Sequence, residues 1–365
     1  MSEPLPALKN WFDEARFRKS AKQLSAISAD FDAKKFLKHA LVALEDLTLM
    51  QRLRRMSESL HVALPANYRA SLDILRIWAP QIDHSFITLV LPDFVGLYGH
   101  DHFKESMNAL AEFTCYGSAE FAVREFLKRD LQRTLGVMKK WSKDRNEHVR
   151  RLACEGCRPR LPWSFRLDAL IKEPELVRPI LHNLRADASL YVRKSVGNHL
   201  NDITKDHPEW VLAIIGEWDL ENAHTAWIAK RGLRTLIKSG HPAALAVIGA
   251  GEKAQVKVHD FSIVPEKVHL GERIKMHLDV TSTASVAQKL VIDYTINYVK
   301  KAGGTSPKVF KWKEVVLPPL TSLQLVKEQR MQNFTTRVHH AGKHRVDVMI
   351  NGELLASDDF NLSIE

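Results

Sequence analysis

The sequence predicts a mainly α-helical chain, in which an α-solenoid of stacked helix pairs is followed by a C-terminal β-sandwich. Two observations carry this prediction. Up to about residue 248, apolar residues recur every three or four positions, as between residues 36 and 44, which is typical of amphipathic helices. After residue 256 the apolar period becomes two, which is typical of strands with one buried face.

The helical segments repeat along residues 1–248. HVRRLACEG from His148 aligns with YVRKSVGNH from Tyr191 at an interval of 191 − 148 = 43 residues, and WIAKRGLRTL from Trp227 has the same outline. Units of the HEAT type recur roughly every 40 residues, so we expect HEAT-like repeats. Such repeats stack into a curved solenoid, and the face lined by the second helices is commonly the binding surface.

Polar residues mark where several of these helices begin. Asn67, Ser118 and Asn146 each precede an apolar periodic segment. Asparagine and serine side chains accept hydrogen bonds from the first free backbone N–H groups of a helix. We therefore predict that these three residues are N-caps.

A change of composition predicts a linker at 249–256 and a second domain at 257–365. About seven short apolar-alternating runs follow, and glycine, proline and asparagine separate them. Asn351-Gly352 between two such runs predicts a type I′ hairpin turn. This number of strands in about 110 residues favours an immunoglobulin-like β-sandwich, and the absence of cysteine there means a sandwich without a disulfide.

The charge of the chain indicates an acidic partner. The formal net charge is +10 and the pI about 9.4. Residues 251–365 hold 16 Lys and Arg against 13 Asp and Glu, and the remainder 37 against 30, so both parts are basic. Nucleic acid is the most common partner of such chains, although a basic protein without such a partner is an equal alternative on charge alone.

Cysteine use and hydropathy indicate the compartment. Only Cys115, Cys154 and Cys157 are present, which argues against a disulfide scaffold and fits a reducing compartment. Cys154 and Cys157 make only half of a zinc site, and no second pair completes it, so we expect no metal. No secretory signal and no bilayer-spanning run is expected. We expect a soluble, cytoplasmic monomer.

Three carboxylates recur at the repeat interval. Glu120 and Glu155 are 35 residues apart, and Glu155 and Asp202 are 47 apart. On neighbouring repeats they would face one concave groove, where acids in a basic chain suggest acid–base chemistry on a polyanion. The alternatives are that Glu120 stabilises the N-terminal dipole of its helix and that Asp202 faces water near a helix end.

Basic and aromatic residues gather around the second carboxylate. Arg151 precedes Glu155 by four residues and shares its helix face, and Arg158, Arg160 and Trp163 follow. A helical ion pair would be worth only a few tenths of a kcal/mol, but this density favours a site. Trp163 is expected at the start of a helix, either in the core or as a flat wall against a base, where cation–π attraction is worth about 0.5–2 kcal/mol.

Further residues are candidates for contacts with phosphate or supporting roles. One set lies near Asp202, and another lies in a basic, histidine-rich segment at 337–345 that we expect to be a loop, as we do the basic segment 300–308. Solvated loop side chains are an equal alternative. The candidates are Arg193, Lys194, Asn198, Arg337, His340, Lys343 and Arg345.

Several of these segments resemble those of a known family, the AlkC-type DNA glycosylases, which are relatives of the AlkD-type enzymes. Two segments resemble signature segments of this family, namely NEHVRRLACEGCRPRLPW from Asn146 and LYVRKSVGNHLNDITKDHPEWV from Leu190. The family segment that precedes them resembles two stretches within residues 91–127, LPDFVGLYGHDHFKESMNALAEFT and SAEFAVREFL. The resemblance spans most of residues 91–210, and a helical domain followed by a β-sandwich matches the family's fuller architecture.

The resemblance implies a monofunctional glycosylase for cationic alkylated bases, chiefly 3-methyladenine and 3-methylcytosine. It implies that lesions in double-stranded DNA are excised without deep base flipping, with water as the co-substrate and without a cofactor. By the motif match, the active-site roles fall on Glu120, Glu155, Trp163 and Asp202. Arg151 and Arg158 then support the carboxylates.

Two other functions are compatible with the same residues. A non-catalytic HEAT-repeat scaffold would leave the three acids solvated on the surface. A damage sensor would bind alkylated DNA without releasing a base. The intact set of Glu155, Trp163 and Asp202 favours the enzyme over both.

Overall fold

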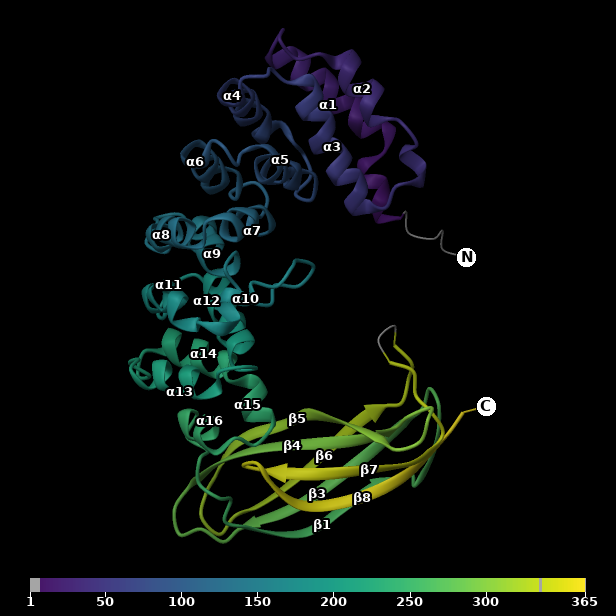
Figure 1. Cartoon of the computed structure of the whole chain (residues 1–365). Coiled ribbons are helices and arrows are strands. Elements are labelled where there is room, and N and C mark those ends of the chain that lie inside the picture. The colour runs from purple at the N-terminus through teal and green to yellow at the C-terminus, as the bar shows by residue number, and fades with distance from the viewer. Residues whose placement is uncertain (1–6, 335–336, 365) are drawn as a thin grey trace. The chain divides into compact units, whose positions relative to one another are not determined.

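The structure is a computed structural model that describes residues 7–334 and 337–364. Within these ranges, α-helices occupy the chain up to Val247 and β-strands begin at Val256 (Figure 1). The described residues form two compact units. The first unit runs to Asp206 and includes Asn222–Ile228, and the second holds His207–Glu221 and everything from Ala229 onward.

The first unit is a stack of short helices. They are α1 (Glu14–Ile27), α2 (Ala33–Ala40), α3 (Leu49–Ala63), α4 (Tyr68–Trp78), α5 (Val90–Tyr98), α6 (Phe103–Phe113), α7 (Glu120–Arg129), α8 (Leu131–Trp141), α9 (Glu147–Glu155), α10 (Asp168–Lys172), α11 (Arg178–Leu184), α12 (Leu190–Ile203) and the first part of α14 (Ala223–Gly232).

The helices of this unit form two rows. Helix α3 packs on α5, α5 packs on α7, and α9 packs on α12, while α4, α6, α8 and α11 lie on the other side of the stack (Figure 1). The apolar faces of both rows meet in a core with fully buried rings such as Trp78, Phe94 and Phe113. This arrangement is the predicted α-solenoid of HEAT-like repeats, in which each helix pair buries its apolar face against its neighbours.

Two of the three predicted N-caps are confirmed. The side chain of Asn67 accepts from the N–H of Ala70 at 3.1 Å, and that of Asn146 accepts from the N–H of His148 at 2.9 Å. The prediction for Ser118 is wrong, because Ala119 is the N-cap of α7 and the Ser118 hydroxyl is hydrogen-bonded to a carboxylate instead.

The second unit is built on two β-sheets. The strands are β1 (Val256–Val264), β2 (Lys267–His269), β3 (Arg273–Ser282), β4 (Gln288–Val299), β5 (Thr305–Leu317), β6 (Ser322–Arg330), β7 (Gly342–Ile350) and β8 (Glu353–Ser363). One sheet has the order β1-β3-β6 and the other β2-β8-β7-β4-β5. The alternating apolar residues of both sheets form one core, which includes Met276, Tyr294 and Phe360.

The strand periodicity predicted most of this sandwich. The immunoglobulin-like fold class is confirmed, and Asn351 and Gly352 have φ of 48° and 83°, as the β7–β8 hairpin turn requires. The three-residue strand β2 was not predicted, because one buried residue between two exposed ones gives no periodic signal. The predicted loops at 300–308 and 337–345 are partly wrong, since β5 begins at Thr305 and β7 at Gly342.

Helices also belong to this second unit. They are α13 (Pro208–Gly216), α15 (Arg234–Lys238), α16 (Pro242–Val247) and the end of α14. Lys289 on β4 donates to the carbonyl of Ile248 at 2.6 Å, and Lys230 pairs with Glu314 on β5 at 2.6 Å. The compact units divide the chain at other residues than the predicted linker at 249–256. The domain boundaries at residues 248 and 257 stay a prediction.

Candidate active site

Three carboxylates come from successive helices of one row of the first unit. Glu120 is the first residue of α7, Glu155 the last residue of α9, and Asp202 lies in the last turn of α12. Two arginines join them into one chain of ion pairs. The predicted proximity of the three acids is therefore seen in the structure, although Glu120 begins its helix and the other two lie at the ends of theirs.

Arg151 links the first two carboxylates. Its Nη1 contacts a carboxylate oxygen of Glu120 and donates to the hydroxyl of Ser118 at 2.6 Å, and Ser118 in turn contacts Glu120. Its Nη2 lies 3.6 Å from Glu155 Oε1, one helical turn away. The guanidinium also lies 5.0 Å from the ring of Tyr191 on α12. Arg151 thus fixes the positions of both glutamates relative to α12.

Arg158 links the second and third carboxylates. Its Nη1 donates to Glu155 Oε1 at 2.6 Å, and its Nε and Nη2 lie 2.9 and 2.8 Å from Asp202 Oδ2. Ser195 donates to the other oxygen of Glu155 at 2.5 Å, and Lys205 lies 3.7 Å from Asp202 Oδ1. Arg158 stands three residues beyond the end of α9, so the chain turns there to bring the guanidinium between the two acids.

The network is buried, which changes its electrostatics. Glu155 and Asp202 are only 5% and 4% exposed, and Arg158 is buried with them. Burial raises the pKa of Asp202, and the charge and hydrogen bonds of Arg158 oppose that rise. For Arg158, burial works toward a lower pKa, but the carboxylates of Glu155 and Asp202 outweigh it and raise the pKa. The alternative of a solvated Asp202 is wrong, because α12 turns this residue into the protein.

The carboxylates that line the adjoining cavity favour a cation. The whole network is formally neutral, because Lys205 joins the two guanidinium groups against three carboxylates. The charged residues that line the cavity are Glu120, Glu155 and Arg158, which leaves one excess negative charge there. Charges in a buried site interact more strongly than in water, because the surroundings screen them less. A positive group brought beside Glu120 or Glu155 would therefore be stabilised.

Trp163 stands in the loop between α9 and α10, not at the start of a helix as predicted. Its side chain is 92% exposed and its φ is 65°, a left-handed conformation that a bulky residue seldom adopts. Proline precedes it and the loop continues to Asp168, where α10 begins. The core alternative for this tryptophan is wrong. A strained backbone that presents a large exposed ring is typical of functional sites.

Arg124 on α7 anchors this loop, and the sequence analysis did not identify it as a candidate residue. Its fully buried guanidinium donates to the carbonyls of Gly156 at 3.0 Å and Arg158 at 2.7 Å, and it contacts the carbonyl of Phe165. Burial lowers the pKa of Arg124 to about 10. The available signal was one arginine among apolar residues on the buried face of α7.

A cavity of about 350 Å³ opens beside the network. Its walls include the charged side chains of Glu120, Glu155 and Arg158 together with apolar side chains of the first unit. Trp163 stands at the same cavity. The residues around it are Met50, Phe86, Leu89, Ser118, Glu120, Phe121, Glu155, Arg158, Leu161, Pro162 and Trp163.

The other predicted residues of the first unit lie outside this network. Arg160 forms a bidentate ion pair with Asp206, with its Nη2 2.8 Å from Asp206 Oδ1. Arg193 donates to the carbonyls of residues 187 and 188 before α12, at 2.8 and 2.7 Å. Lys194 is exposed and Asn198 is half-buried on the same helix. Roles for these residues in DNA binding stay predictions.

The predicted residues of the sandwich surround β7. Lys343 pairs with Asp359 at 2.9 Å, and Arg345 pairs with Asp347 at 2.7 Å. Arg337 lies 4.4 Å from the ring centre of Tyr298, and His340 is half-buried. Exposed ion pairs of this kind contribute little to the stability of the fold. A phosphate contact by any of these residues stays a prediction.

The cysteines do not gather with other ligands. Cys154 and Cys157 are free and buried, and the sulfur of Cys157 donates to the carbonyl of Ala153 at 3.2 Å. Within residues 7–334 and 337–364, no group of three or more His, Cys, Asp or Glu side chains has the geometry of a metal site. In the same ranges, no helix is both long and apolar enough to cross a membrane.

Comparisons with known proteins agree in both parts of the chain. The family model "DNA alkylation repair enzyme" matches residues 100–236, and "Uncharacterised protein YhaZ, C-terminal Ig-like domain" matches residues 257–364. The uncharacterized protein YhaZ of Bacillus subtilis is 39% identical over 97% of this chain and 99% of its own length.

One solved structure is similar along the whole chain. The alkylpurine DNA glycosylase AlkC of Pseudomonas fluorescens, bound to DNA containing an abasic site analogue, is 53% identical. The match covers 98% of this chain and 100% of that one, with a TM-score of 0.94. Both the repeat stack and the sandwich therefore have counterparts in a protein whose DNA complex is known.

Proposed function

This chain belongs to the AlkC family of DNA glycosylases, and we propose that it excises small cationic alkylated bases, chiefly 3-methyladenine and 3-methylcytosine, from double-stranded DNA. The observation that carries this proposal is the chain of ion pairs through Glu120, Glu155 and Asp202 beside an open cavity. The similar glycosylase from Pseudomonas fluorescens was solved with DNA that contains an abasic site analogue, and an abasic site is what remains after base release.

The chemistry of the substrate explains why carboxylates suffice. A base methylated at N3 carries a positive charge, so it leaves as a neutral molecule and needs little help from a general acid. Positive charge then develops on the sugar as the glycosidic bond breaks. Preorganised negative groups beside that charge lower the barrier, because they need no rearrangement at the moment of reaction. The carboxylates of Glu120 and Glu155 at the cavity supply such groups.

We assign the three acids distinct roles. Glu155 lies at the cavity, and Ser195 and Arg158 hold both of its oxygens, so it is a fixed charge for the cationic sugar. Asp202 is tied to Arg158 and is not among the residues that line the cavity, and the motif match assigns it to positioning or deprotonating the attacking water. Glu120 is at the cavity wall as well and orients the water or the sugar. Arg151 and Arg158 position the carboxylates.

The exposure of Trp163 supports a mechanism without deep base flipping. Its ring stands 92% exposed on a loop that Arg124 anchors, so it can reach a lesion that stays near the helix axis of the DNA. Its face would contact the cationic base or the sugar, where cation–π attraction contributes about 0.5–2 kcal/mol. The usual route, in which a nucleotide swings into an enclosing pocket, is not needed for a base that leaves unaided.

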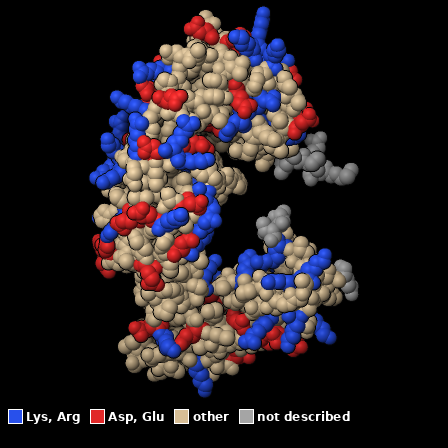
Figure 2. Space-filling view, viewed as in Figure 1, with Lys and Arg blue, Asp and Glu red and all other residues tan. Residues whose placement is uncertain are grey.

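The partner is therefore alkylated duplex DNA, with water as the co-substrate. A net charge of +10 favours binding to phosphates, and Figure 2 shows Lys and Arg side chains over both compact units with acids among them. We propose that the protein acts as a monomer in the cytoplasm, and that Lys343 and Arg345 contact phosphate.

Base release from methylated DNA, followed by chromatography, tests this function. We expect release of 3-methyladenine or 3-methylcytosine by the wild type, and a loss of at least about 100-fold in rate for Glu155→Gln or Asp202→Asn. Glu147→Gln is the matched control, because Glu147 is an exposed glutamate at the other end of the same helix.

Two results would contradict the proposal. DNA binding without release of any methylated base by the wild type would indicate a damage sensor or a scaffold. Release at the wild-type rate when Glu155→Gln and Asp202→Asn are combined would show that the acid network is not the catalytic site.

A further inference from the structure

A second and larger cavity adjoins the one at the acid network. It has a volume of about 470 Å³, within the range of roughly 300–1,000 Å³ that is typical of small-molecule sites. Met50, Leu89, Ser118, Phe121 and Trp163 border both cavities. A molecule set free beside Glu155 therefore has a neighbouring space that shares these five residues as a border.

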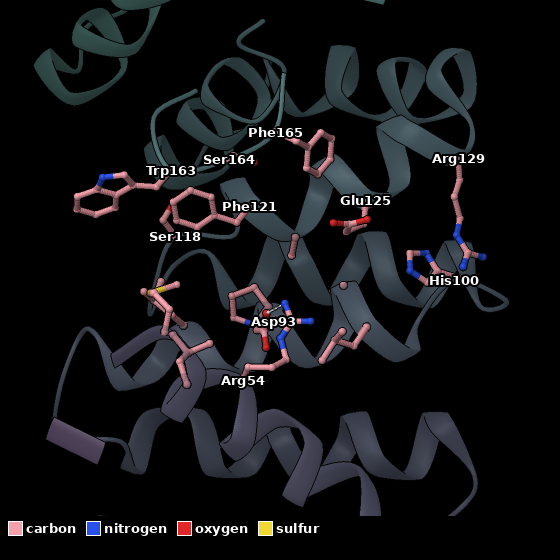
Figure 3. A pocket seen from close by; sticks show the side chains of 17 residues that line it. Arg54, Asp93, His100, Ser118, Phe121, Glu125, Arg129, Trp163, Ser164 and Phe165 are labelled. Atoms are coloured by element: carbon pink, nitrogen blue, oxygen red, sulfur yellow. Dashed lines mark hydrogen bonds and ion pairs between the residues drawn. The ribbon is translucent and has the colours of Figure 1, made fainter. Parts of the chain in front are cut away.

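The walls of this cavity suit a flat ring (Figure 3). Phe121 and Phe165 stand on one side of it, and Asp93 and Arg54 stand on the opposite side (Figure 3). The ring of Phe165 is held in place, because the guanidinium of Arg124 lies 5.2 Å from its centre. Leucine and proline side chains from α3 and α5 supply further apolar surface.

The polar groups of the cavity suit a ligand that donates hydrogen bonds. Asp93 accepts from Arg54 Nη2 at 3.0 Å through Oδ1, and Ser57 also acts on this carboxyl group. Asp93 and Glu125 both line the cavity, so two carboxylates belong to its wall. Carboxylate oxygens accept hydrogen bonds and donate none when ionised, so the wall suits a ligand with an N–H donor.

The electrostatics of these groups agree with such a ligand. Burial raises the pKa of Asp93, against the influence of Ser57 and Arg54, and burial lowers the pKa of His100. A donor that approaches the carboxylate of Asp93 would favour its ionised form. A phosphate would instead meet the carboxylates of Asp93 and Glu125, so an anion is disfavoured despite Arg54 and Arg129 nearby.

We propose that this cavity binds the alkylated base after its excision, with the ring against Phe121 and Phe165 and the exocyclic amino group donating to the carboxylate of Asp93. The inference rests on the proposed function, since 3-methyladenine and 3-methylcytosine both carry such an amino group. It adds a product site, bordered by Trp163 and Phe121, that retains the base next to the reaction cavity.

Binding of free 3-methyladenine to the full-length protein, measured by calorimetry, tests the proposal. We expect saturable binding that is weakened at least about tenfold by Asp93→Asn, because the substituted amide lacks the charge of the acceptor. Asp73→Asn is the matched control, as Asp73 also pairs with an arginine, Arg76, but lies exposed and outside the cavity. It should bind like the wild type.

A second ligand makes the test independent of the variant's folding. 3-Methylpurine, which lacks the amino group, should bind the wild type at least about tenfold more weakly than 3-methyladenine. The proposal is overturned if 3-methyladenine shows no saturable binding up to about 10 mM, if a folded Asp93→Asn protein binds it as the wild type does, or if the two ligands bind equally.

Base release by the same wild-type preparation separates this proposal from the proposed function. If methylated DNA loses its alkylated bases but the free base does not bind, only the product site is wrong. If no base is released, the proposed function itself fails.

Discussion

Arg158 is the residue on which the acid network depends. It donates to Glu155 at 2.6 Å and to Asp202 at 2.9 Å from one buried guanidinium. Planar, permanently charged arginine can satisfy two carboxylates in this way, whereas lysine offers a single point charge. Loss of this one side chain leaves two buried acids close together with less compensation, and the pKa of Asp202 loses the lowering influence of Arg158.

A pH profile tests this role. Burial raises the pKa of Asp202 above 3.8 and Arg158 opposes the rise, so Arg158→Gln should raise that pKa further. Because the proposed mechanism uses the ionised form of Asp202, base release should decline as the pH falls through this pKa. The acid limb of the rate, corrected for spontaneous depurination, should therefore lie above pH 3.8 in the wild type and at higher pH in Arg158→Gln.

Arg160→Gln provides the comparison. Arg160 belongs to the same loop, but its ion pair is with Asp206, so its acid limb should coincide with that of the wild type. An acid limb for Arg158→Gln that is unshifted, or that moves to lower pH, would show that Arg158 does not set the titration of the active carboxylate.

The loop between α9 and α10 is the element that shapes the site. It carries Arg158 and Trp163, and it contains no helix or strand of its own. Its order comes from Arg124 on α7, whose guanidinium reaches three of its backbone carbonyls. At Gly156, a Cβ atom would lie 2.4 Å from a methyl carbon of Val123, so the chain leaves α9 through a position that only glycine fits.

Replacing the anchor should loosen the loop. Arg124→Lys keeps a positive charge but cannot reach three carbonyls at once, so we expect a loss of about 2–4 kcal/mol in the free energy of unfolding, measured with urea. Trypsin should also cut the Arg160–Leu161 bond faster than in the wild type. Arg133 is an exposed residue of the next helix, and Arg133→Lys should change the free energy of unfolding by less than about 0.5 kcal/mol. Equal stability and equal cleavage in Arg124→Lys would refute the anchoring role.

At the scale of the whole molecule, the sequence predicted regular patterns well and irregular backbone poorly. The α-solenoid and the β-sandwich follow from periodicity, because a repeat places successive helices side by side. The repeat interval also indicated that Glu120, Glu155 and Asp202 lie close together, although Glu120 begins its helix and the other two lie at the ends of theirs. The strand β2 was missed, because three residues carry no period.

The contacts that sequence reading missed are those that depend on loop conformation. Ser118 serves a carboxylate and not a helix end. Arg124 meets carbonyls 32 to 41 residues away in the chain, and no spacing rule predicts such partners. The left-handed backbone of Trp163 is likewise set by the loop that holds it and not by local preference, which disfavours it.

Binding of the whole protein to DNA is the most direct test of the proposal that the acid network stabilises a cationic sugar. The measurement is the affinity for two duplexes that differ at one site, where one carries a positively charged pyrrolidine in place of the sugar and the other a neutral tetrahydrofuran. At one salt concentration the phosphate contribution is the same for both. We expect binding to the cationic duplex to be tighter by at least about tenfold, and we expect Glu155→Gln to abolish most of this preference while Glu147→Gln retains it. Equal affinity of the wild type for the two duplexes would contradict the claim.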